Sequence, residues 1–355
     1  MTSTGHPTPT SASATASSPA LLHDVDSILT AYRAPDSPGA SVIVIRNGRT
    51  LLSRAYGLAD VEAHTPITES TNFRLASLTK QFTATAILLL VHDGKLALDD
   101  RVASILTELP AHARDVTVRQ LLTHTSGLWA YEDFVPDSQT VQVKDRDVPR
   151  LLAHADSTYF RPGSAFRYSN TGYALLSLVV ERKSGQTFAR FLHDRIFAPL
   201  GMDSTVAYEA GISTVPQRAF GYSRGVSATA FRRTDQSNTS AVLGDGGIYT
   251  SIHDLARWSR ALDEHTLIDA RTQQMAWTAA TLTDGSNAPY GFGWWVNHDA
   301  FGLKLWHNGE TRGFTNGIVK YPERGITVIV LTNRSGGKPW ELAAAIAHLP
   351  LLERF

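Results

Sequence analysis

The sequence predicts an α+β fold in which both ends of the chain build one antiparallel sheet and a mostly helical region is inserted between them. Strand-like apolar runs occur near the N-terminus, at residues 40–45 and 50–56, and again near the C-terminus, at 304–307, 317–321 and 326–332. Between these two groups the apolar residues have mostly helical spacing. A helix is also predicted at each end, so the sheet has helices to cover it.

The first twenty residues predict a disordered tail. Thirteen of the first nineteen are Ser, Thr or Pro, and the first charged side chain is that of Asp24, so this segment has little apolar surface to bury. It lacks the basic start and the apolar stretch of an intact secretory signal. We expect a cytoplasmic protein as the sequence is written, or a periplasmic or secreted protein if a leader was trimmed, and both interpretations stay open.

The ordered chain begins with a predicted helix and a β-hairpin. Apolar residues recur at helical spacing over residues 21–32, which gives one face for a core. Asn47 and Gly48 then separate two strand-like runs, and Asn-Gly in that position is a strong hairpin signal. Near the other end, residues 322–325 predict a turn between two strands, and Pro339 predicts the start of a final helix over 340–348.

Six segments of the remaining chain have helical periodicity, namely residues 79–92, 118–123, 147–155, 172–181, 187–197 and 253–262. Loops that contain Gly, Ser and Asp separate them. The sequence therefore predicts three parts, which are the tail at 1–20, a discontinuous sheet domain at 21–75 and 246–355, and a mostly helical domain at 76–245.

Composition excludes several classes of function. The chain has 33 basic and 33 acidic residues, and this balance argues against a nucleic-acid scaffold or a membrane-surface binder. It has no Cys, which excludes disulfides, Cys-ligated zinc, iron–sulfur clusters and thiol nucleophiles. The apolar run at residues 86–91, which no other run exceeds in length, is too short to span a bilayer. The 13 His residues show no metal-binding spacing such as His-Glu-x-x-His.

Ser77-Leu78-Thr79-Lys80 is the first of three segments that carry candidate chemistry. If Ser77 lies on the first turn of the following helix, Lys80 lies on the same face three residues later. The helix N-terminus adds a partial positive charge, and a nearby amine can take part in removing the proton that makes a serine hydroxyl nucleophilic. The simpler interpretation is a helix-capping Ser and a solvated Lys, because Ser-x-x-Lys is common by chance.

Tyr168-Ser169-Asn170 is the second segment, and it precedes the helix predicted at 172–181. A neighbouring cation favours the anion of a Tyr phenol, so Tyr168 beside Lys80 could serve as a general base. The amide of Asn170 could hold both Lys80 and a substrate carbonyl. The alternative is a core Tyr followed by a helix-capping Asn.

His307-Asn308-Gly309-Glu310 is the third segment, at the end of the strand predicted over 304–306. Gly309 would let a substrate approach the backbone closely, and the edge of a strand exposes N–H groups that can bind a developing oxyanion. The alternative is an ordinary strand end with a half-buried His.

Taken together and in this order, the motifs Ser-x-x-Lys, Tyr-x-Asn and His-x-Gly resemble those of the serine beta-lactamase and penicillin-binding-protein superfamily. Within it they are similar to the class C beta-lactamase-related branch, which includes D-alanyl-D-alanine carboxypeptidases, D-amino-acid peptidases and amidases, and esterases. Segments 121–128, 199–202 and 246–249 also resemble that branch, so the resemblance runs from about residue 21 to the end. It implies a beta-lactamase/transpeptidase-like α+β fold, with no metal and no organic cofactor.

The resemblance also implies site residues: Ser77, Lys80, Tyr168 and His307 as catalytic, and Asn170, Asn308, Gly309 and Glu310 as substrate-binding. Ser77 would be the acylated nucleophile, and Lys80 and Tyr168 would transfer its proton. His307 would be the cation or hydrogen-bond donor on the strand, and the backbone N–H groups of Ser77 and Glu310 would form the oxyanion hole. Which of Tyr168 and Lys80 is the resting base stays open, since a coupled pair has no single answer.

The leading hypothesis is a serine hydrolase that forms an acyl-enzyme on Ser77 and acts on an ester or amide of a small substrate. An ester is favoured over a beta-lactam, because His307 is cationic only part of the time near neutral pH and Glu310 adds a carboxylate that Arg312 could neutralise. The alternatives are a D-amino-acid amidase or peptidase, in which Glu310 could attract a substrate ammonium, a D-alanyl-D-alanine carboxypeptidase, or a class C beta-lactamase. An alternative of another class is a penicillin-recognising binding module with little turnover.

Other features compete with this interpretation. Residues 221–225 match the Gly-x-Ser-x-Gly nucleophile elbow of α/β-hydrolases around Ser223, but the chain lacks the repeated β-α-β pattern of that fold. His124 precedes a Ser-Gly turn and is predicted to be structural rather than catalytic. Four aromatic residues in predicted loops either line an apolar acyl pocket or fill ordinary core, namely Trp129, Tyr131, Trp294 and Trp295.

Overall fold

The computed structural model describes residues 18–136, 138–225 and 230–355, and it has the predicted α+β architecture. Residues 1–17 of the predicted tail lie outside the described residues. Helix α1 (Pro19–Ile28) begins two residues earlier than predicted, with Pro19 at a first-turn position that needs no backbone N–H. A 3₁₀ turn (Thr30–Tyr32) replaces the last turn of the predicted helix.

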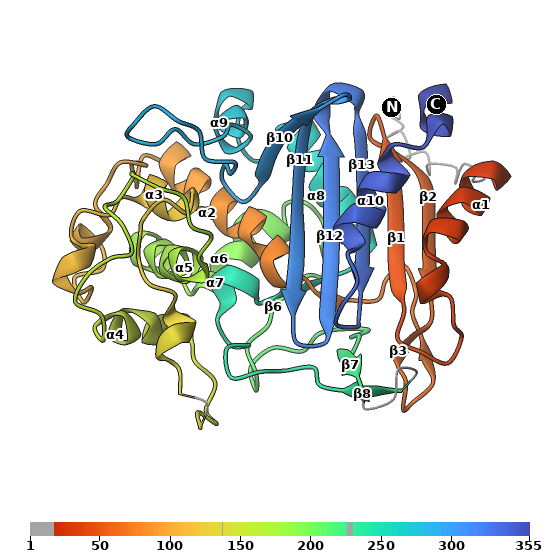
Figure 1. Cartoon of the computed structure of the whole chain (residues 1–355), viewed down its shortest axis with the longest axis horizontal. Helices are drawn as coiled ribbons and strands as arrows, with labels where there is room; N and C mark the ends of the chain where they lie inside the picture. Colours follow the sequence, from red (N-terminus) through yellow and green to blue (C-terminus); the bar gives the residue numbers. More distant parts are fainter. Residues whose placement is uncertain (1–17, 137, 226–229) are drawn as a thin grey trace, which may run out of the picture.

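Six antiparallel strands form the main sheet, in the order β10-β11-β12-β13-β1-β2 (Figure 1). They are β1 (Ala40–Arg46), β2 (Arg49–Tyr56), β10 (Trp295–Asp299), β11 (Gly302–Thr311), β12 (Phe314–Tyr321) and β13 (Ile326–Thr332). Because β1 pairs with β13, the two ends of the chain meet inside one sheet. The predicted hairpin turns at Asn47 and Gly48, and both have the positive φ that its tight turn requires.

Two parts of the sheet differ from the prediction. Strand β10 includes Trp295, which we had predicted to lie in a loop. The strand was missed because its last three residues, 297–299, are all exposed and give no alternating pattern. Strand β11 continues to Thr311 instead of ending at His307, and it pairs with β12 along this whole stretch. The third motif therefore lies inside a strand rather than at its end.

Helices cover both faces of the sheet. Helices α1 and α10 (Pro339–Ala347) lie on one face, and α8 (Ile252–Asp263) packs against the other (Figure 1). The side chains of β1 alternate accordingly: Val42 and Val44 belong to the core under α1 and α10, whereas Ile43 and Ile45 belong to the larger core on the opposite face.

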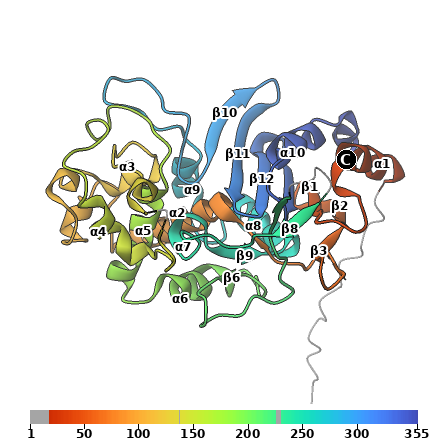
Figure 2. The ribbon, with the colours of Figure 1, turned by 60° about the horizontal axis from the view of Figure 1, so that its bottom comes forward.

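The middle of the chain is mostly helical, and its helices gather beyond the β10–β11 side of the sheet (Figure 2). They are α2 (Lys80–His92), α3 (Val118–Leu122), α4 (Val148–Leu152), α5 (Asn170–Ser184), α6 (Phe188–Leu192), α7 (Leu243–Gly246) and, further along, α9 (Ala270–Ala276). Helix α5 is central, since it packs against α2, α3 and α7. The helix predicted at 187–197 is in fact α6 followed by a π-helical turn (His193–Phe197).

Short strands connect these layers. Strands β5 (Phe73–Arg74), β9 (Ile248–Thr250) and β6 (Val206–Ala207) form a small sheet. Strand β3 (Leu58–Asp60) pairs with β4 (Thr65–Pro66), and β7 (Tyr222–Arg224) pairs with β8 (Phe231–Arg233). The proposed domain division at residues 75 and 246 stays a prediction. Over the described ranges, no helix has the length and apolar character needed to cross a membrane.

Candidate active site

Ser77 lies on a 3₁₀ turn (Ala76–Thr79) that leads directly into α2. The preceding residue, Ala76, has a φ of 50°, a left-handed conformation that is uncommon for residues with a Cβ atom. The surrounding sheets hold this turn. The N–H of Leu75 donates to the carbonyl of Ile248 at 2.8 Å, and the side-chain amide of Asn316 donates to the carbonyls of Arg74 and Leu75 at 2.8 and 3.2 Å.

Gly309 on β11 gives the turn its space. A Cβ atom at this position would lie 2.1 Å from the carbonyl oxygen of Leu75 and 3.0 Å from Cδ1 of Leu78. We expected Gly309 to make room for a substrate. In the structure it makes room for the turn that carries Ser77, because that turn packs directly on the strand.

Lys80 is fully buried, and its Nζ atom contacts Oγ of Ser77 at 3.0 Å, Oδ1 of Asn170 at 2.8 Å and the carbonyl of Asp245 at 3.0 Å. The amide and carbonyl oxygens can only accept hydrogen bonds. A charged ammonium would donate to all three oxygens, whereas a neutral amine would donate to these two and offer its lone pair to the Ser77 hydroxyl. The same three contacts therefore fit Lys80 both before it takes the proton of Ser77, as a neutral amine, and afterwards, as an ammonium.

Asn170 begins α5 and joins Lys80 to Glu132, a residue that the sequence analysis did not identify. Its Nδ2 donates to Oε1 of Glu132 at 2.7 Å, so its Oδ1 is left to accept from Lys80. The other carboxylate oxygen of Glu132 is buried and has no hydrogen-bond partner among the residues that the structure describes. A buried carboxylate oxygen without a donor is costly unless a ligand or water supplies one.

Ser77 opens into a cavity of about 290 Å³ that three acidic residues help to line, namely Glu132, Asp245 and Glu310. Burial raises the pKa of the Asp245 carboxyl to about 7, and the carboxylate of Glu132 adds to this rise while the charge of Lys80 opposes it. The hydroxyl of Tyr131 donates to Asp245 at 3.0 Å. The cavity therefore gains negative charge as the pH rises through neutrality.

Tyr168 lies beside Lys80, with its ring centroid 5.0 Å from Nζ. The ring is fixed by aromatic neighbours, since its centroid is 4.3 Å from that of His124 and 5.9 Å from the nearly parallel ring of Trp295. Its hydroxyl is buried and has no hydrogen-bond partner within the described ranges, so it contacts neither Ser77 nor Lys80 through a hydrogen bond.

His307 is fully buried and neutral, which corrects the expectation of a partly cationic side chain. Its Nδ1 donates to the carbonyl of Asn308 at 2.6 Å, because that oxygen can only accept, and its Nε2 accepts from the hydroxyl of Tyr290 at 2.8 Å. Burial and, to a smaller extent, the nearby charge of Lys80 together lower the pKa of His307 to about 3. The side chain therefore supplies no positive charge to a substrate at neutral pH.

Asn308 does not face Ser77. It pairs with Gly317, whose missing side chain lies against the backbone of Trp340 in α10, so Asn308 points to the α10 face of the sheet. This corrects its expected role in substrate binding. The error arose because the motif was placed after the strand, where side chains do not alternate between two faces.

The backbone of Glu310 lies on an open edge of the sheet. Thr311 and Phe314 close a two-residue hairpin, so Glu310 and Thr315 form the next, non-hydrogen-bonded pair, and the N–H of Glu310 points away from β12. On that side β10 pairs with β11 only up to Trp306. This N–H is thus available at the cavity wall that Ser77 and Glu310 share.

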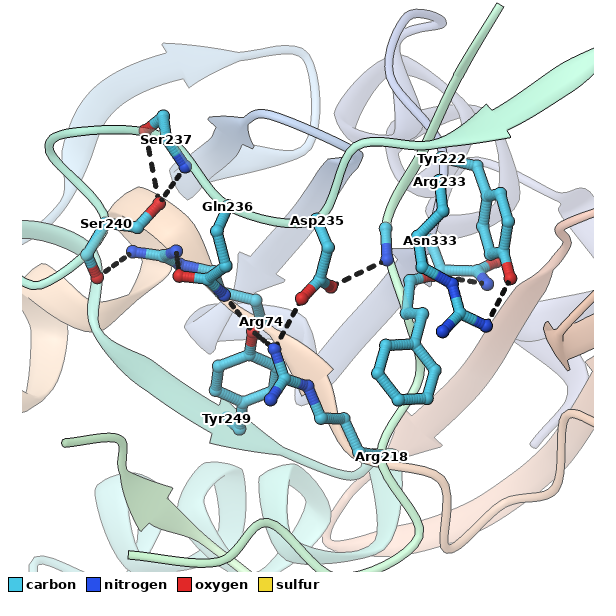
Figure 3. Close-up of polar contacts among 12 residues, drawn as sticks. Arg74, Arg218, Tyr222, Arg233, Asp235, Gln236, Ser237, Ser240, Tyr249 and Asn333 are labelled. Atoms are coloured by element: carbon cyan, nitrogen blue, oxygen red, sulfur yellow. Dashed lines mark hydrogen bonds and ion pairs between the residues drawn. The ribbon is translucent and has the colours of Figure 1, made fainter. Parts of the chain in front are cut away.

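Two arginines border the same cavity. Arg312 is exposed and forms no ion pair among the described residues. Arg74 is buried and donates to the carbonyl of Ser240 at 2.8 Å and to the side chain of Gln236 at 3.3 Å (Figure 3). It also donates to the carbonyl of Gly246 at 3.2 Å. These bonds attach residues 236–240 to the small sheet beside Ser77.

Figure 3 also shows how this attachment continues, since Arg218 reaches both Asp235 and the hydroxyl of Tyr249. Tyr249 in turn accepts from Gln236 at 3.0 Å. A row of polar contacts therefore links the cavity wall to strand β9. Of these residues only Tyr249 had been noted from the sequence, as part of the segment 246–249.

The competing features take structural positions. Ser223 lies on strand β7, and its hydroxyl contacts those of Thr234 and Ser335, with no base bonded to it among the residues that the structure describes. The nucleophile-elbow interpretation is therefore unsupported. Of the four aromatic residues, Tyr131 lines the cavity and Trp294 is core, while Trp295 stacks on Tyr168.

Known proteins share this architecture. The family model described as Beta-lactamase matches residues 25–351. A penicillin-binding protein of Bacillus subtilis is 32% identical over 320 residues, a match that covers 85% of this chain and 70% of that protein. A D-aminopeptidase of Gluconobacter oxydans is 30% identical over 300 residues, covering 83% of this chain and 56% of that protein.

The solved structure of a penicillin-binding protein from Bacillus halodurans is also similar, with a TM-score of 0.78, 28% identity, and coverage of 92% of this chain and 98% of that one. Fold and relatives together define the class of protein as a hydrolase of the serine type, which confirms the prediction. The chain belongs to the beta-lactamase family.

Proposed function

We propose that this hydrolase forms an acyl-enzyme on Ser77 and then hydrolyses it, with a small ester or amide as substrate. The observation that carries the proposal is the 3.0 Å contact between Ser77 and the buried amine of Lys80, at the wall of a cavity. A solvated Lys would make no such contact. A pure binding module would also need no base held against a hydroxyl, which argues against that alternative.

In the first step the Ser77 oxygen bonds to the substrate carbonyl carbon while its proton passes to the Lys80–Tyr168 pair. The N–H groups of Ser77 and Glu310 stabilise the oxyanion. The bond to the leaving group then breaks, and the pair returns the proton to the departing alcohol or amine. In the second step water attacks the acyl carbon and gives a proton to the pair. The bond between the acyl carbon and the Ser77 oxygen then breaks, the pair returns the proton to Ser77, and the acid leaves.

We propose an ester as the preferred substrate over a beta-lactam. The neutral His307 supports this, because a beta-lactam carboxylate at the third motif would lack a charge-assisted contact of about 1.5–3 kcal/mol. That corresponds to roughly ten- to a hundred-fold in specificity. Arg312 is the opposing observation, since its guanidinium borders the cavity and could supply the missing charge.

Catalytic efficiencies on a butyrate ester and a chromogenic cephalosporin test this proposal, each measured on the wild type, Ser77→Ala and Arg312→Gln. We expect the ester to be preferred and Ser77→Ala to be inactive on both substrates. A cephalosporin preferred at least tenfold would refute the ester proposal. If that preference then disappears in Arg312→Gln, Arg312 is the cation that the argument left out.

A second candidate is the hydrolysis of amides or peptides of amino acids with a free amino group, and Glu132 favours it. Glu132 lines the cavity together with Asp245 and Glu310, and one of its carboxylate oxygens has no hydrogen-bond partner among the described residues. A substrate ammonium would satisfy that oxygen and balance the charge. The D-aminopeptidase among the relatives is consistent with such a substrate.

The comparison of D-alanine p-nitroanilide with its N-acetyl derivative tests this candidate. Loss of one charge-assisted contact in Glu132→Gln is expected to raise KM for the free amine about ten- to a hundred-fold. The Gln side chain keeps an acceptor for Asn170, so KM for an ester should change little. Glu310→Gln is the matched control, and an equal effect of both changes would argue against a specific role for Glu132.

A further inference from the structure

His124 holds the backbone on both sides of Tyr168. Its carbonyl accepts the N–H of Arg167 at 3.0 Å, and its Nδ1 accepts the N–H of Ser169 at 3.2 Å. Its ring also lies against the ring of Tyr168, with centroids 4.3 Å apart. One residue therefore binds the two N–H groups that flank Tyr168 and packs on the side chain between them.

The imidazole is suited to this contact in one protonation state only. His124 is buried, and burial lowers its pKa well below the usual value, with the charge of Lys80 adding to the effect. Because Nδ1 accepts from Ser169, the ring hydrogen of the neutral form is on Nε2. The rings of Tyr173 and Tyr290 face His124. Burial raises the pKa of both phenols above the ordinary value, so both stay uncharged at neutral pH.

Packing alone does not explain a histidine here. Its Nε2 is buried and has no hydrogen-bond partner in the described part of the chain, which carries a cost that a Phe ring would avoid. Its φ of 58° adds backbone strain. What His124 provides and Phe lacks is the acceptor for the N–H of Ser169, at the residue before the helix that begins with Asn170.

We propose that His124 is a positioning residue for the reaction, which fixes the Tyr168 phenol beside Lys80 by holding the backbone on either side of it. The inference rests on the proposed function, since it concerns catalysis only if Tyr168 takes part in proton transfer. His124 touches no reacting atom in this account. It acts through the placement of Tyr168.

The test compares His124→Asn with His124→Leu. Asn tolerates a left-handed φ and can offer Oδ1 where Nδ1 stood, whereas Leu fills space without an acceptor. A misplacement of about 1 Å can cost roughly 100-fold in rate, so we expect His124→Leu to lower the acylation rate about 10- to 100-fold with little change in KM. We expect His124→Asn to be acylated at least tenfold faster than His124→Leu. Both variants lose the ring, so both should melt at a lower temperature than the wild type.

His265→Leu is the matched control, because His265 is exposed and has a similar φ of 53°. This control measures what a Leu with a left-handed backbone conformation costs by itself, without the loss of the hydrogen-bond acceptor. It should leave the acylation rate unchanged. Equal acylation rates per folded protein in His124→Asn and His124→Leu would overturn the proposal.

A double mutant separates this proposal from the function on which it rests. In a Tyr168→Phe background, His124→Leu is expected to cause little further loss, because both changes remove the same contribution. Additive losses would overturn the role of His124 while leaving that of Tyr168. If Tyr168→Phe alone keeps the wild-type rate, Tyr168 takes no part in proton transfer and the role of His124 falls with it, whereas the acyl-enzyme on Ser77 stands with Lys80 as the sole base.

Nitrogen-15 NMR of histidine-labelled wild-type protein tests the contact without any substitution. We expect His124 to keep its hydrogen on Nε2 from pH 5 to pH 9. A hydrogen on Nδ1 would overturn the proposal, since that nitrogen could not then accept from Ser169.

Discussion

Gly309→Ala is expected to impair turnover much more than folding, because the new methyl group would collide with the turn that carries Ser77. The methyl carbon would lie 2.1 Å from the Leu75 carbonyl oxygen, where ordinary contacts begin at 3.4 Å. The turn or the strand must therefore move by roughly 1 Å, a displacement that can cost about 100-fold in rate. This corresponds to about 2.7 kcal/mol in the activation barrier.

Gly317→Ala provides a control in the neighbouring strand. Its methyl carbon would lie 2.3 Å from the backbone nitrogen of Trp340, a similar collision on the α10 face of the sheet. Overpacking of this kind typically costs about 1–3 kcal/mol of stability, so we expect both variants to melt earlier. Only Gly309→Ala should lose turnover per folded molecule.

The assay is burst titration of active sites followed by kcat on a p-nitrophenyl ester, with thermal unfolding measured in parallel. Equal losses of turnover in Gly309→Ala and Gly317→Ala would refute the argument, because they would show that the sheet as a whole, and not the Ser77 turn, responds. A wild-type turnover in Gly309→Ala would refute it as well.

Two further predictions concern Tyr168 and Asp245. Tyr168→Phe should slow acylation about 10²–10⁴-fold at an unchanged melting temperature, because the phenol has no hydrogen-bond partner among the described residues for the change to remove; a near-wild-type rate would leave Lys80 as the sole base. For Asp245, the pKa in the folded state is about 7 and lies above the ordinary value of 3.8. The favourable contribution of this carboxyl group to the free energy of unfolding is therefore fully present below pH 4 and is lost as the pH rises to about 7. Asp245→Asn should therefore gain stability relative to the wild type from pH 4 to pH 8, by about 4 kcal/mol at most, in denaturant titrations. A difference that is constant with pH would contradict this.

The sequence predicted those parts of the molecule that depend on local pattern. The turn at Asn47 and Gly48 and the helix after Ser77 follow from residues that are neighbours in the chain. The third motif was harder, because the polar residues Asn308 and Glu310 hide the continuation of β11. Its pairing with β12 overrides the local preference, and this pairing decides which side chains face Ser77.

Glu132 and Asp245 could not be placed in the site from the sequence, because they lie far from Ser77 along the chain and only tertiary packing brings them to its cavity. The one available signal for Asp245 was its position next to the Gly246-Gly247 pair, a segment already noted for its resemblance. The neutral state of His307 was equally hidden, since it follows from complete burial and from the hydroxyl of Tyr290.

The central claim is that Ser77 becomes acylated, and mass spectrometry of the trapped intermediate tests it most directly. The wild type and Ser77→Ala would be mixed with a slowly hydrolysed acyl donor, quenched in acid, and analysed as intact protein and as peptides. We predict one added acyl group on the wild type, located at Ser77, and none on Ser77→Ala. An acyl group found on Ser223, or retained by Ser77→Ala, would contradict the account.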